Sequence, residues 1–200
     1  MAAASRRRVQ TVFFDAGGTL IDSPPFFPYF AMRIAPGLAE QIAPVMKERF
    51  QTTLRDESLP FAPIKVLLAR VIAEICAEYG LPDQSGHAAG FYRELFTVEA
   101  RLYDDVIECL ERLRVTRKRM VVVSDADAEI LHLELERFGI RDYFDDFVIS
   151  SDIRGYKPSR AMAEAAAALC PEPRSGGIYV GDDAVDVQPL RTMGVSVSVF

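Results

Sequence analysis

The 200-residue sequence contains few residues of the kinds that form disulfides or bind zinc: three cysteines and two histidines. The cysteines, Cys76, Cys109 and Cys170, lie far apart, each within an apolar-periodic segment. An odd, scattered set of this kind argues against a disulfide framework and against a zinc site. We therefore expect three buried, reduced thiols.

Long apolar runs and a surplus of basic charge are also lacking. No apolar stretch approaches the ~20 residues that a transmembrane helix needs, and we find no internal repeat or low-complexity tract. The formal net charge is −6, so no general attraction to nucleic acid or to anionic membranes is expected. We expect a cytoplasmic monomer or homodimer whose partner is a small molecule.

Strand and helix patterns alternate from Tyr103 onward. Short continuous apolar runs predict buried strands, and apolar residues at helical spacing predict the helices between them. The expected strands are 12–14, 120–123, 147–149, 178–180 and 195–200, and the expected helices are 104–116, 126–138, 161–169 and a short stretch toward Met193. Repeated strand–helix–strand units predict an α/β fold with a doubly wound parallel sheet.

The alternation disappears between Ile21 and Tyr103. Prolines and aromatic residues form the exit from the first strand at 24–30, and amphipathic helices are expected at 36–54, 63–79 and 88–102. A helical insertion at this point would lie above the carboxyl edge of the sheet, where a lid belongs. We predict an α/β core of residues 1–22 and 103–200 with an inserted α-helical cap domain of residues 23–102.

Four strand ends each offer a polar group. Asp15 closes the first strand in Phe14-Asp15-Ala16-Gly17-Gly18-Thr19, and Ser124 closes the second. Lys157 follows the third, and the fourth ends in Gly181-Asp182-Asp183-Ala184-Val185-Asp186. Because the carboxyl ends of parallel strands share one edge of the sheet, we expect these groups to converge. The neighbouring Asp22, Asp125 and Asp127 are interpreted as helix caps or solvated charges.

These residue types suit phosphoryl transfer to a carboxylate. An aspartate is ionised near neutral pH, but an anionic phosphate repels it. A Mg²⁺ ion bridging Asp15 and Asp182 would remove that repulsion, and Lys157 can neutralise charge on the transferring group. The candidate donors to the phosphoryl oxygens are the Ser124 hydroxyl and the backbone amides of Ala16, Gly17 and Asp125.

The four segments resemble, in order, the motifs of the haloacid dehalogenase (HAD) superfamily: Asp-x-x-Gly-Thr-Leu, a strand-terminal Ser, Lys-Pro, and Gly-Asp-Asp-x-x-Asp. The resemblance spans residues 12–186, and the insertion is similar to that family's helical type-1 cap. It implies a Rossmann-like core in which Asp15 is the nucleophile, forming an aspartyl-phosphate, and Lys157 is a second catalytic residue. It also implies a Mg²⁺ ion held by Asp15, the Gly17 carbonyl and Asp182. Asp186 would bind the ion directly, bind it through water, or orient Lys157. Asp183 is also a possible ligand, ranked below its neighbours.

Position 17 departs from the family pattern. Most phosphatases of this family carry a second aspartate there, which protonates the leaving oxygen and then deprotonates the attacking water. Such general acid–base help is typically worth ~10²–10⁴-fold, and Gly17 cannot provide it. Haloacid dehalogenases also lack this aspartate, but they need no metal and usually lack the acidic fourth motif that this chain retains. Phosphonoacetaldehyde hydrolases lack it too, and they need a cap lysine for a Schiff base; here Lys47 and Lys65 are the cap's only lysines.

We therefore expect an enzyme, a Mg²⁺-dependent phosphatase of small phosphorylated metabolites. It would be weakly active, or would act on a good leaving group such as an acyl or aryl phosphate. Two alternatives stay open. One is a haloacid dehalogenase or phosphonatase-type hydrolase, and the other is a catalytically weak, phosphatase-like protein used for binding or regulation.

Overall fold

A computed structural model describes residues 9–56, 58–171, 176–182, 191 and 194–199. Contacts between Cα atoms divide the chain into two compact units. Unit one consists of Met1–Asp22, Leu102–Asp125 and Phe138–Phe200, and unit two consists of Ser23–Arg101 and Ala126–Arg137. The predicted helix toward Met193 and the predicted site residues Asp183 and Asp186 lie outside the described residues.

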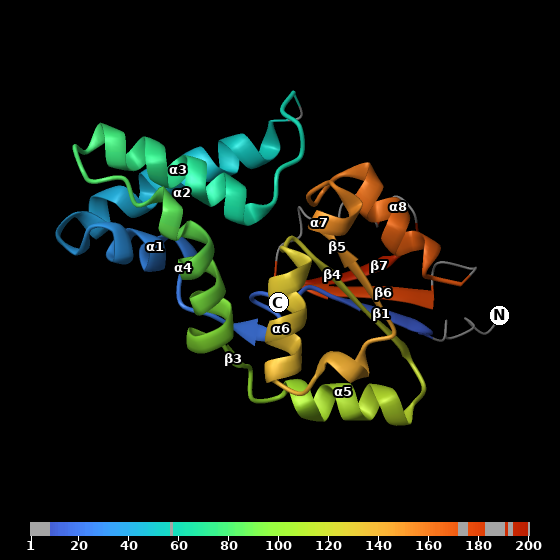
Figure 1. The fold of residues 1–200 in the computed structure, drawn as a ribbon. Coiled ribbons are helices and arrows are strands. Elements are labelled where there is room, and N and C mark those ends of the chain that lie inside the picture. Colours follow the sequence, from blue (N-terminus) through green and yellow to red (C-terminus); the bar gives the residue numbers. More distant parts are fainter. Residues whose placement is uncertain (1–8, 57, 172–175, 183–190, 192–193, 200) are drawn as a thin grey trace. The chain divides into compact units, whose positions relative to one another are not determined.

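Unit one is built on a five-stranded parallel sheet (Figure 1). Its strands are β1 (Thr11–Phe14), β4 (Arg119–Ser124), β5 (Asp146–Ile149), β6 (Gly177–Gly181) and β7 (Ser196–Val199). Their order across the sheet is β5-β4-β1-β6-β7, so β1 occupies the centre and all four of its residues are buried. The predicted parallel α/β sheet is confirmed, with a strand at each of the five expected places.

Helices of unit one cover the sheet and connect its strands. They are α5 (Val106–Val115), the short η4 (Arg141–Tyr143), α7 (Ser150–Ile153) and α8 (Arg160–Ala168). The alanine-rich α8 packs on the sheet, and its Met162 and Ala166 share a buried cluster with Phe13, Val121 and Tyr179. Small alanine side chains allow this helix to approach the strands closely.

The cysteine prediction is wrong at one position. Cys76 and Cys170 are buried, but Cys109 is exposed. Helix α5 buries only Val106 and Leu110, which are one helical turn apart, so Cys109 lies beside that narrow stripe. The apolar pattern at 104–116 therefore located the helix but overestimated the width of its buried face.

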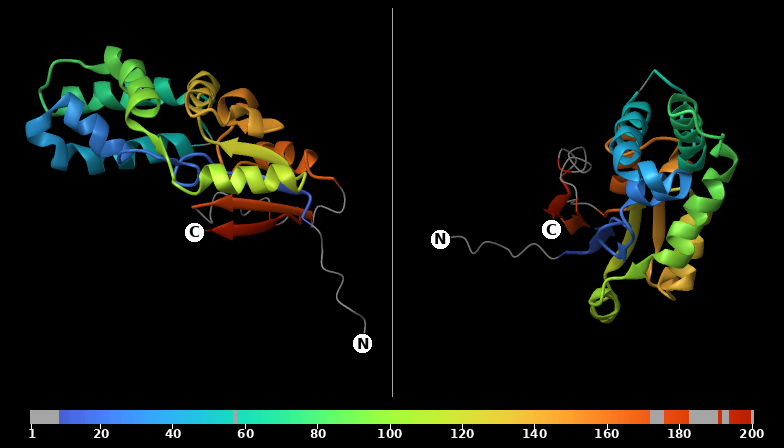
Figure 2. Two further views of the ribbon diagram at one scale, coloured as in Figure 1. Left: turned by 90° about the horizontal axis from the view of Figure 1, so that it is seen from below. Right: turned by 90° about the vertical axis from the view of Figure 1, so that its left-hand side faces the viewer.

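Unit two consists of helices (Figure 2). They are α1 (Phe26–Ile34), η1 (Pro36–Leu38), α2 (Ala39–Arg55), α3 (Ile64–Glu78), η2 (Ser85–His87), α4 (Ala88–Glu94), the π-helix η3 (Leu95–Glu99) and α6 (Ala128–Arg137). The rings of Phe26, Phe30, Phe50 and Tyr92 pack together, joining α1 to α2 and α4. These aromatic side chains therefore form part of the unit's own core.

Two local predictions in this region need correction. The predicted exit from the first strand at 24–30 is partly helical, because α1 begins at Phe26. The helix predicted at 88–102 ends at Glu99, and Arg101–Leu102 forms the short strand β3, the counterpart of β2 (Ile21–Asp22). The π-helical turn explains the early end, because its Leu95 carbonyl accepts the Ala100 N–H and closes the helix. No helix in the described part of the chain is long and apolar enough to cross a membrane.

Candidate active site

Asp15 lies at the carboxyl end of the central strand. Strand β1 is apolar and buried, and the backbone N–H of Asp15 continues its pairing by donating to the Val180 carbonyl. The side chain then turns back locally, since its Oδ1 accepts the Ala16 N–H at 2.8 Å. Asp15 is only 7% exposed, so its carboxylate needs further polar partners.

Lys157 provides the principal partner. Its Nζ donates to Asp15 Oδ2 at 2.8 Å, and the two side chains are 5% and 11% exposed. The two residues are 142 positions apart in the sequence and meet because the loop between α7 and α8 lies at the edge where β1 ends. The structure thus brings the predicted nucleophile and the predicted lysine into direct contact.

The environment of Asp15 acts on its protonation in opposing directions. Burial raises the pKa of Asp15, the Lys157 ammonium group lowers it, and the charge of Asp182 raises it slightly further. The net direction is upward from the ordinary value of an aspartate. A second positive charge close to Asp15 would therefore favour its ionised, nucleophilic form.

Tyr179 is a site residue that the sequence analysis missed. It is a fully buried residue of β6, and Lys157 Nζ lies 3.4 Å from its hydroxyl oxygen. Gly181 accommodates its ring, because a Cβ at that position would lie 2.6 Å from Tyr179 Cε1. The sequence feature that indicates such a role is a tyrosine inside an otherwise apolar strand, because a buried phenol usually forms a hydrogen bond.

Ser124 and Asp125 lie at the end of the adjacent strand. Ser124 is the last residue of β4 and is buried, at the carboxyl edge where Asp15 also lies. The carboxylate of Asp125 accepts the Lys157 N–H at 2.9 Å and so is neither a helix cap nor a solvated charge. The earlier interpretation of Asp125 was therefore wrong: its side chain holds the backbone of the lysine loop.

The turn after Asp15 differs in part from the predicted arrangement of phosphoryl donors. The Ala16 N–H, a predicted donor, is bonded to Asp15 itself. Gly17 is exposed, and a Cβ built on it would meet nothing within 4 Å. Gly18 adopts a φ of +74°, which strongly favours glycine, and its N–H donates to the Ile21 carbonyl. The turn therefore leaves open space around position 17.

Asp182 places a second carboxylate beside this turn. A Cβ on Gly18 would lie only 2.3 Å from Asp182 Oδ2, so a side chain at position 18 would exclude that carboxylate. Asp15, Asp182 and the Gly17 carbonyl are oxygen donors of the type that Mg²⁺ prefers, and Mg²⁺ usually keeps waters and substrate phosphate as its other ligands. This donor set fits the ion. The described residues contain no group of three or more His, Cys, Asp or Glu able to hold a metal.

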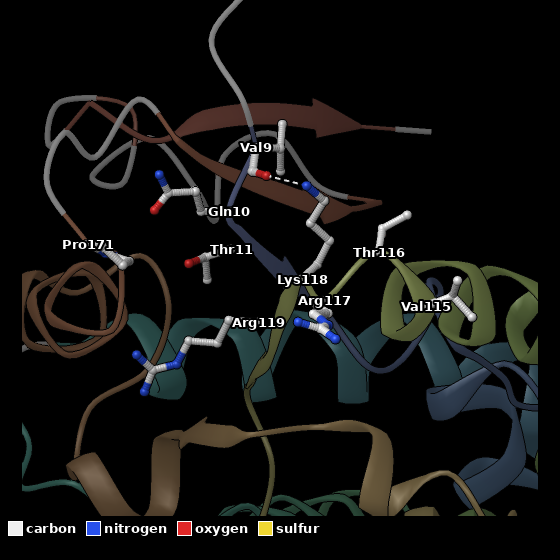
Figure 3. A pocket seen from close by; sticks show the side chains of 9 residues that line it. All are labelled: Val9, Gln10, Thr11, Val115, Thr116, Arg117, Lys118, Arg119 and Pro171. Carbon is white, nitrogen blue, oxygen red and sulfur yellow. Dashed lines mark hydrogen bonds between the residues drawn. The ribbon is translucent and has the colours of Figure 1, made fainter.

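A separate pocket of about 700 Å³ lies at the other edge of the sheet (Figure 3). Its lining includes Thr11 and Arg119, the first residues of β1 and β4, whereas Asp15 and Ser124 end those strands. Lys118 Nζ there donates to the Val9 carbonyl at 2.6 Å (Figure 3), and Arg119 pairs with Asp146. None of the predicted site residues contributes to this pocket.

Comparison with curated proteins finds phosphatases of similar length. The chain is 27% identical over 199 residues to the 6-phosphogluconate phosphatase of Escherichia coli strain K12, covering 96% of this chain and 83% of that protein. It is 26% identical over 195 residues to the phosphoglycolate phosphatase of Haemophilus influenzae strain 86-028NP, covering 92% of this chain and 82% of that protein. It is 24% identical to pyrophosphatase PpaX of Bacillus velezensis, covering 96% of this chain and 83% of that protein.

Comparison with solved structures finds dehalogenases. The L-2-haloacid dehalogenase RSc1362 superposes with a TM-score of 0.78 at 21% identity, covering 95% of this chain and 85% of that one. The L-2-haloacid dehalogenase of Xanthobacter autotrophicus superposes with a TM-score of 0.73 at 21% identity, covering 96% of this chain and 77% of that one. Likeness at this identity shows the fold alone. The family model of the haloacid dehalogenase-like hydrolases, which describes the sequences of that family, matches residues 9–194 of this chain. The chain therefore belongs to the haloacid dehalogenase-like hydrolase family.

Proposed function

We propose that this hydrolase is a Mg²⁺-dependent phosphatase of small phosphorylated molecules, with Asp15 as the phosphoryl acceptor. The observation that carries the proposal is the buried contact between Asp15 and Lys157 at the carboxyl edge of the sheet, with Asp182 beside the same turn. A paired lysine and two carboxylates suit an anionic phosphoryl group and its metal. The phosphatases among the relatives support small phosphorylated molecules in general as substrates.

The reaction follows from these positions. A carboxylate oxygen of Asp15 bonds to phosphorus, and the bond from phosphorus to the leaving oxygen breaks with its electron pair on that oxygen. Water then attacks the aspartyl-phosphate, releasing inorganic phosphate and restoring Asp15. The ammonium group of Lys157 offsets negative charge on the transferring group, and the Ser124 hydroxyl donates to it. Mg²⁺, held by Asp15, the Gly17 carbonyl and Asp182, would neutralise phosphate charge and align it for attack.

Gly17 restricts the leaving group. Without a carboxyl at this position, no side chain of the turn can protonate the departing oxygen, and the surrounding space is open. An alkoxide leaves poorly without a proton, whereas a carboxylate or a phenolate leaves readily. Acyl and aryl phosphates are therefore the proposed substrate class.

The lysines of unit two count against the phosphonatase alternative. Lys65 pairs with Glu129 at 2.6 Å, and that hydrogen bond raises the pKa of Lys65. A lysine that forms a Schiff base needs the opposite, a lowered pKa, to be nucleophilic near neutral pH. Lys47 is exposed on α2.

Release of p-nitrophenol and of acetate tests the proposal. The full chain is assayed with p-nitrophenyl phosphate and acetyl phosphate, with and without Mg²⁺, beside the near-isosteric Asp15→Asn. We expect Mg²⁺-dependent release that Asp15→Asn abolishes. Halide release from 2-haloacids without metal would instead identify a dehalogenase, and phosphate release from phosphonoacetaldehyde a phosphonatase. Phosphate binding without any turnover would indicate a binding or regulatory protein.

A further inference from the structure

The lysine loop, residues 154–159, joins α7 to α8 within unit one. Two local hydrogen bonds shape it: the Gly155 N–H donates to the Ser150 carbonyl at 3.2 Å, and the Ser159 N–H donates to the Tyr156 carbonyl at 2.8 Å. Because each bond joins neighbouring parts of the chain, the two fix the shape of the loop rather than its distance from the sheet.

Asp125 ties this loop to the sheet. Its two carboxylate oxygens lie 2.9 and 3.2 Å from the backbone nitrogen of Lys157, and both accept its N–H. Asp125 directly follows Ser124, the last residue of β4, which pairs with Ile149 of β5. The carboxylate therefore acts from a strand end that the sheet already holds. A hydrogen bond to a carboxylate is also about twice as strong as one between neutral groups.

The side chain of Lys157 depends on this backbone anchor, because packing leaves space beside it. Lys157 lines a cavity of about 10 Å³ together with Val123, Met162, Ala163 and Tyr179. The four-carbon stem of a lysine is flexible, and these neighbours do not enclose it completely. A shift of the Lys157 backbone would therefore move the ammonium group.

The ammonium group needs accurate placement. Its nitrogen lies 2.8 Å from Asp15 Oδ2 but 3.4 Å from the Tyr179 hydroxyl oxygen, which is longer than most hydrogen bonds. A displacement of about 1 Å would lengthen the first contact and could remove the second, and errors of this size are costly at reacting groups.

We infer that Asp125 is a positioning residue for Lys157: by holding the backbone N–H of the lysine, it sets the contact between the ammonium group and Asp15. All three residues belong to unit one. The consequence for catalysis rests on the proposed function, in which Lys157 offsets negative charge on the transferring phosphoryl group. Loss of the Asp125 carboxylate should weaken both the contact and the reaction.

Urea unfolding measures the contact without substrate or metal. The wild type, Asp15→Asn, Lys157→Met and the double variant together give the coupling free energy between Asp15 and Lys157, and the same set is then made with Asp125→Ala. Asp145→Ala is the matched control, because the Asp145 carboxylate also accepts a backbone N–H, that of Met120 at 2.8 Å, near the other end of β4.

We expect Asp125→Ala to lower the coupling by up to about half, the loss that a doubled distance between the two charges would cause. In assays with p-nitrophenyl phosphate and Mg²⁺, kcat/KM should fall about tenfold. Asp125→Asn keeps an acceptor oxygen and should recover most of this loss, to about two- to threefold below the wild type, because a neutral acceptor bonds more weakly. Asp145→Ala should change neither quantity.

Wild-type coupling in Asp125→Ala would overturn the inference. If kcat/KM is also unchanged, Asp125 has a structural role only; if kcat/KM falls alone, the effect belongs to the Asp125 N–H, a proposed phosphoryl donor. If Asp125→Ala does not fold, Asp125→Asn decides, and wild-type values of both quantities at lowered stability would overturn the inference. A wild type without phosphatase activity would remove the proposed function, while the coupling, measured without substrate, would still decide the role of Asp125.

Discussion

The ammonium nitrogen of Lys157 lies 2.8 Å from Oδ2 of Asp15, and both side chains are almost completely buried. Two desolvated opposite charges at this distance depend on each other, because removal of either partner leaves a charge in an environment that cannot solvate it. The pair is therefore a structural element as well as the centre of the proposed chemistry.

The first prediction concerns the stability of this pair. Lys157→Met should lower the free energy of unfolding by about 3–5 kcal/mol, because Asp15 would remain buried without its cation. Adding Asp15→Asn to that variant should recover part of the loss. Urea denaturation at neutral pH measures both, with Lys47→Met as the control at an exposed lysine. Equal losses for Lys157→Met and Lys47→Met would show that the pair contributes nothing to folding.

The second prediction concerns the missing acid. Gly17→Asp should raise kcat on alkyl phosphates, by up to ~10²–10⁴-fold, because a carboxyl could then protonate the leaving oxygen. The space around position 17 admits the side chain. Gly17→Asn has the same size without the acid and serves as the control. If both variants change kcat equally, or neither does, the limitation lies elsewhere in the site.

The third prediction concerns Tyr179. Tyr179→Phe should lower kcat/KM about three- to tenfold, since one hydrogen bond to Lys157 is worth roughly 0.5–1.5 kcal/mol net. Tyr143→Phe is the matched control, because that phenol also forms a hydrogen bond, which it donates to Glu111 on α5, but outside the site. Steady-state kinetics on p-nitrophenyl phosphate compare the two. An effect of the same size in both variants would argue against a role for Tyr179 in the site.

The fourth prediction concerns the pH dependence of stability. Glu134, on α6, is 3% exposed, and burial raises its pKa to about 8 from 4.5, against the opposing charge of Arg137. Between these two values the folded protein keeps a proton that the unfolded chain releases. The free energy of unfolding should therefore fall as pH rises from about 4.5 to 8, by an amount on the order of 4 kcal/mol.

Glu134→Gln should remove this slope and stabilise the protein at pH 8, because glutamine stays neutral throughout. The exposed Glu136 on the same helix supplies the control, as Glu136→Gln should leave the slope unchanged. Urea unfolding between pH 5 and pH 8.5 gives the profiles. A slope that persists in Glu134→Gln would assign it to other groups.

Much of the fold and part of the candidate site follow from local patterns. Continuous apolar runs predicted the strands because a strand buried on both faces admits few polar residues. The parallel arrangement then predicted Asp15, Ser124, Lys157 and Asp182 at one edge of the sheet, since strand direction alone decides which ends meet. Gly17 could likewise be identified as the missing acid, because a residue type is a property of the sequence.

The partners of those groups depended on tertiary structure. Whether Lys157 meets Tyr179, whether Asp125 holds the lysine loop, and whether Asp127 caps α3 depend on how loops and helices from distant parts of the chain approach one another. Hydrogen bonds require donor and acceptor within about 3 Å, and no periodicity in the sequence encodes a distance across 63 residues. The sequence alone therefore determined the strands, their common edge and the types of group at that edge. Only the tertiary structure decided which carboxylate binds which backbone, because that choice is made by packing.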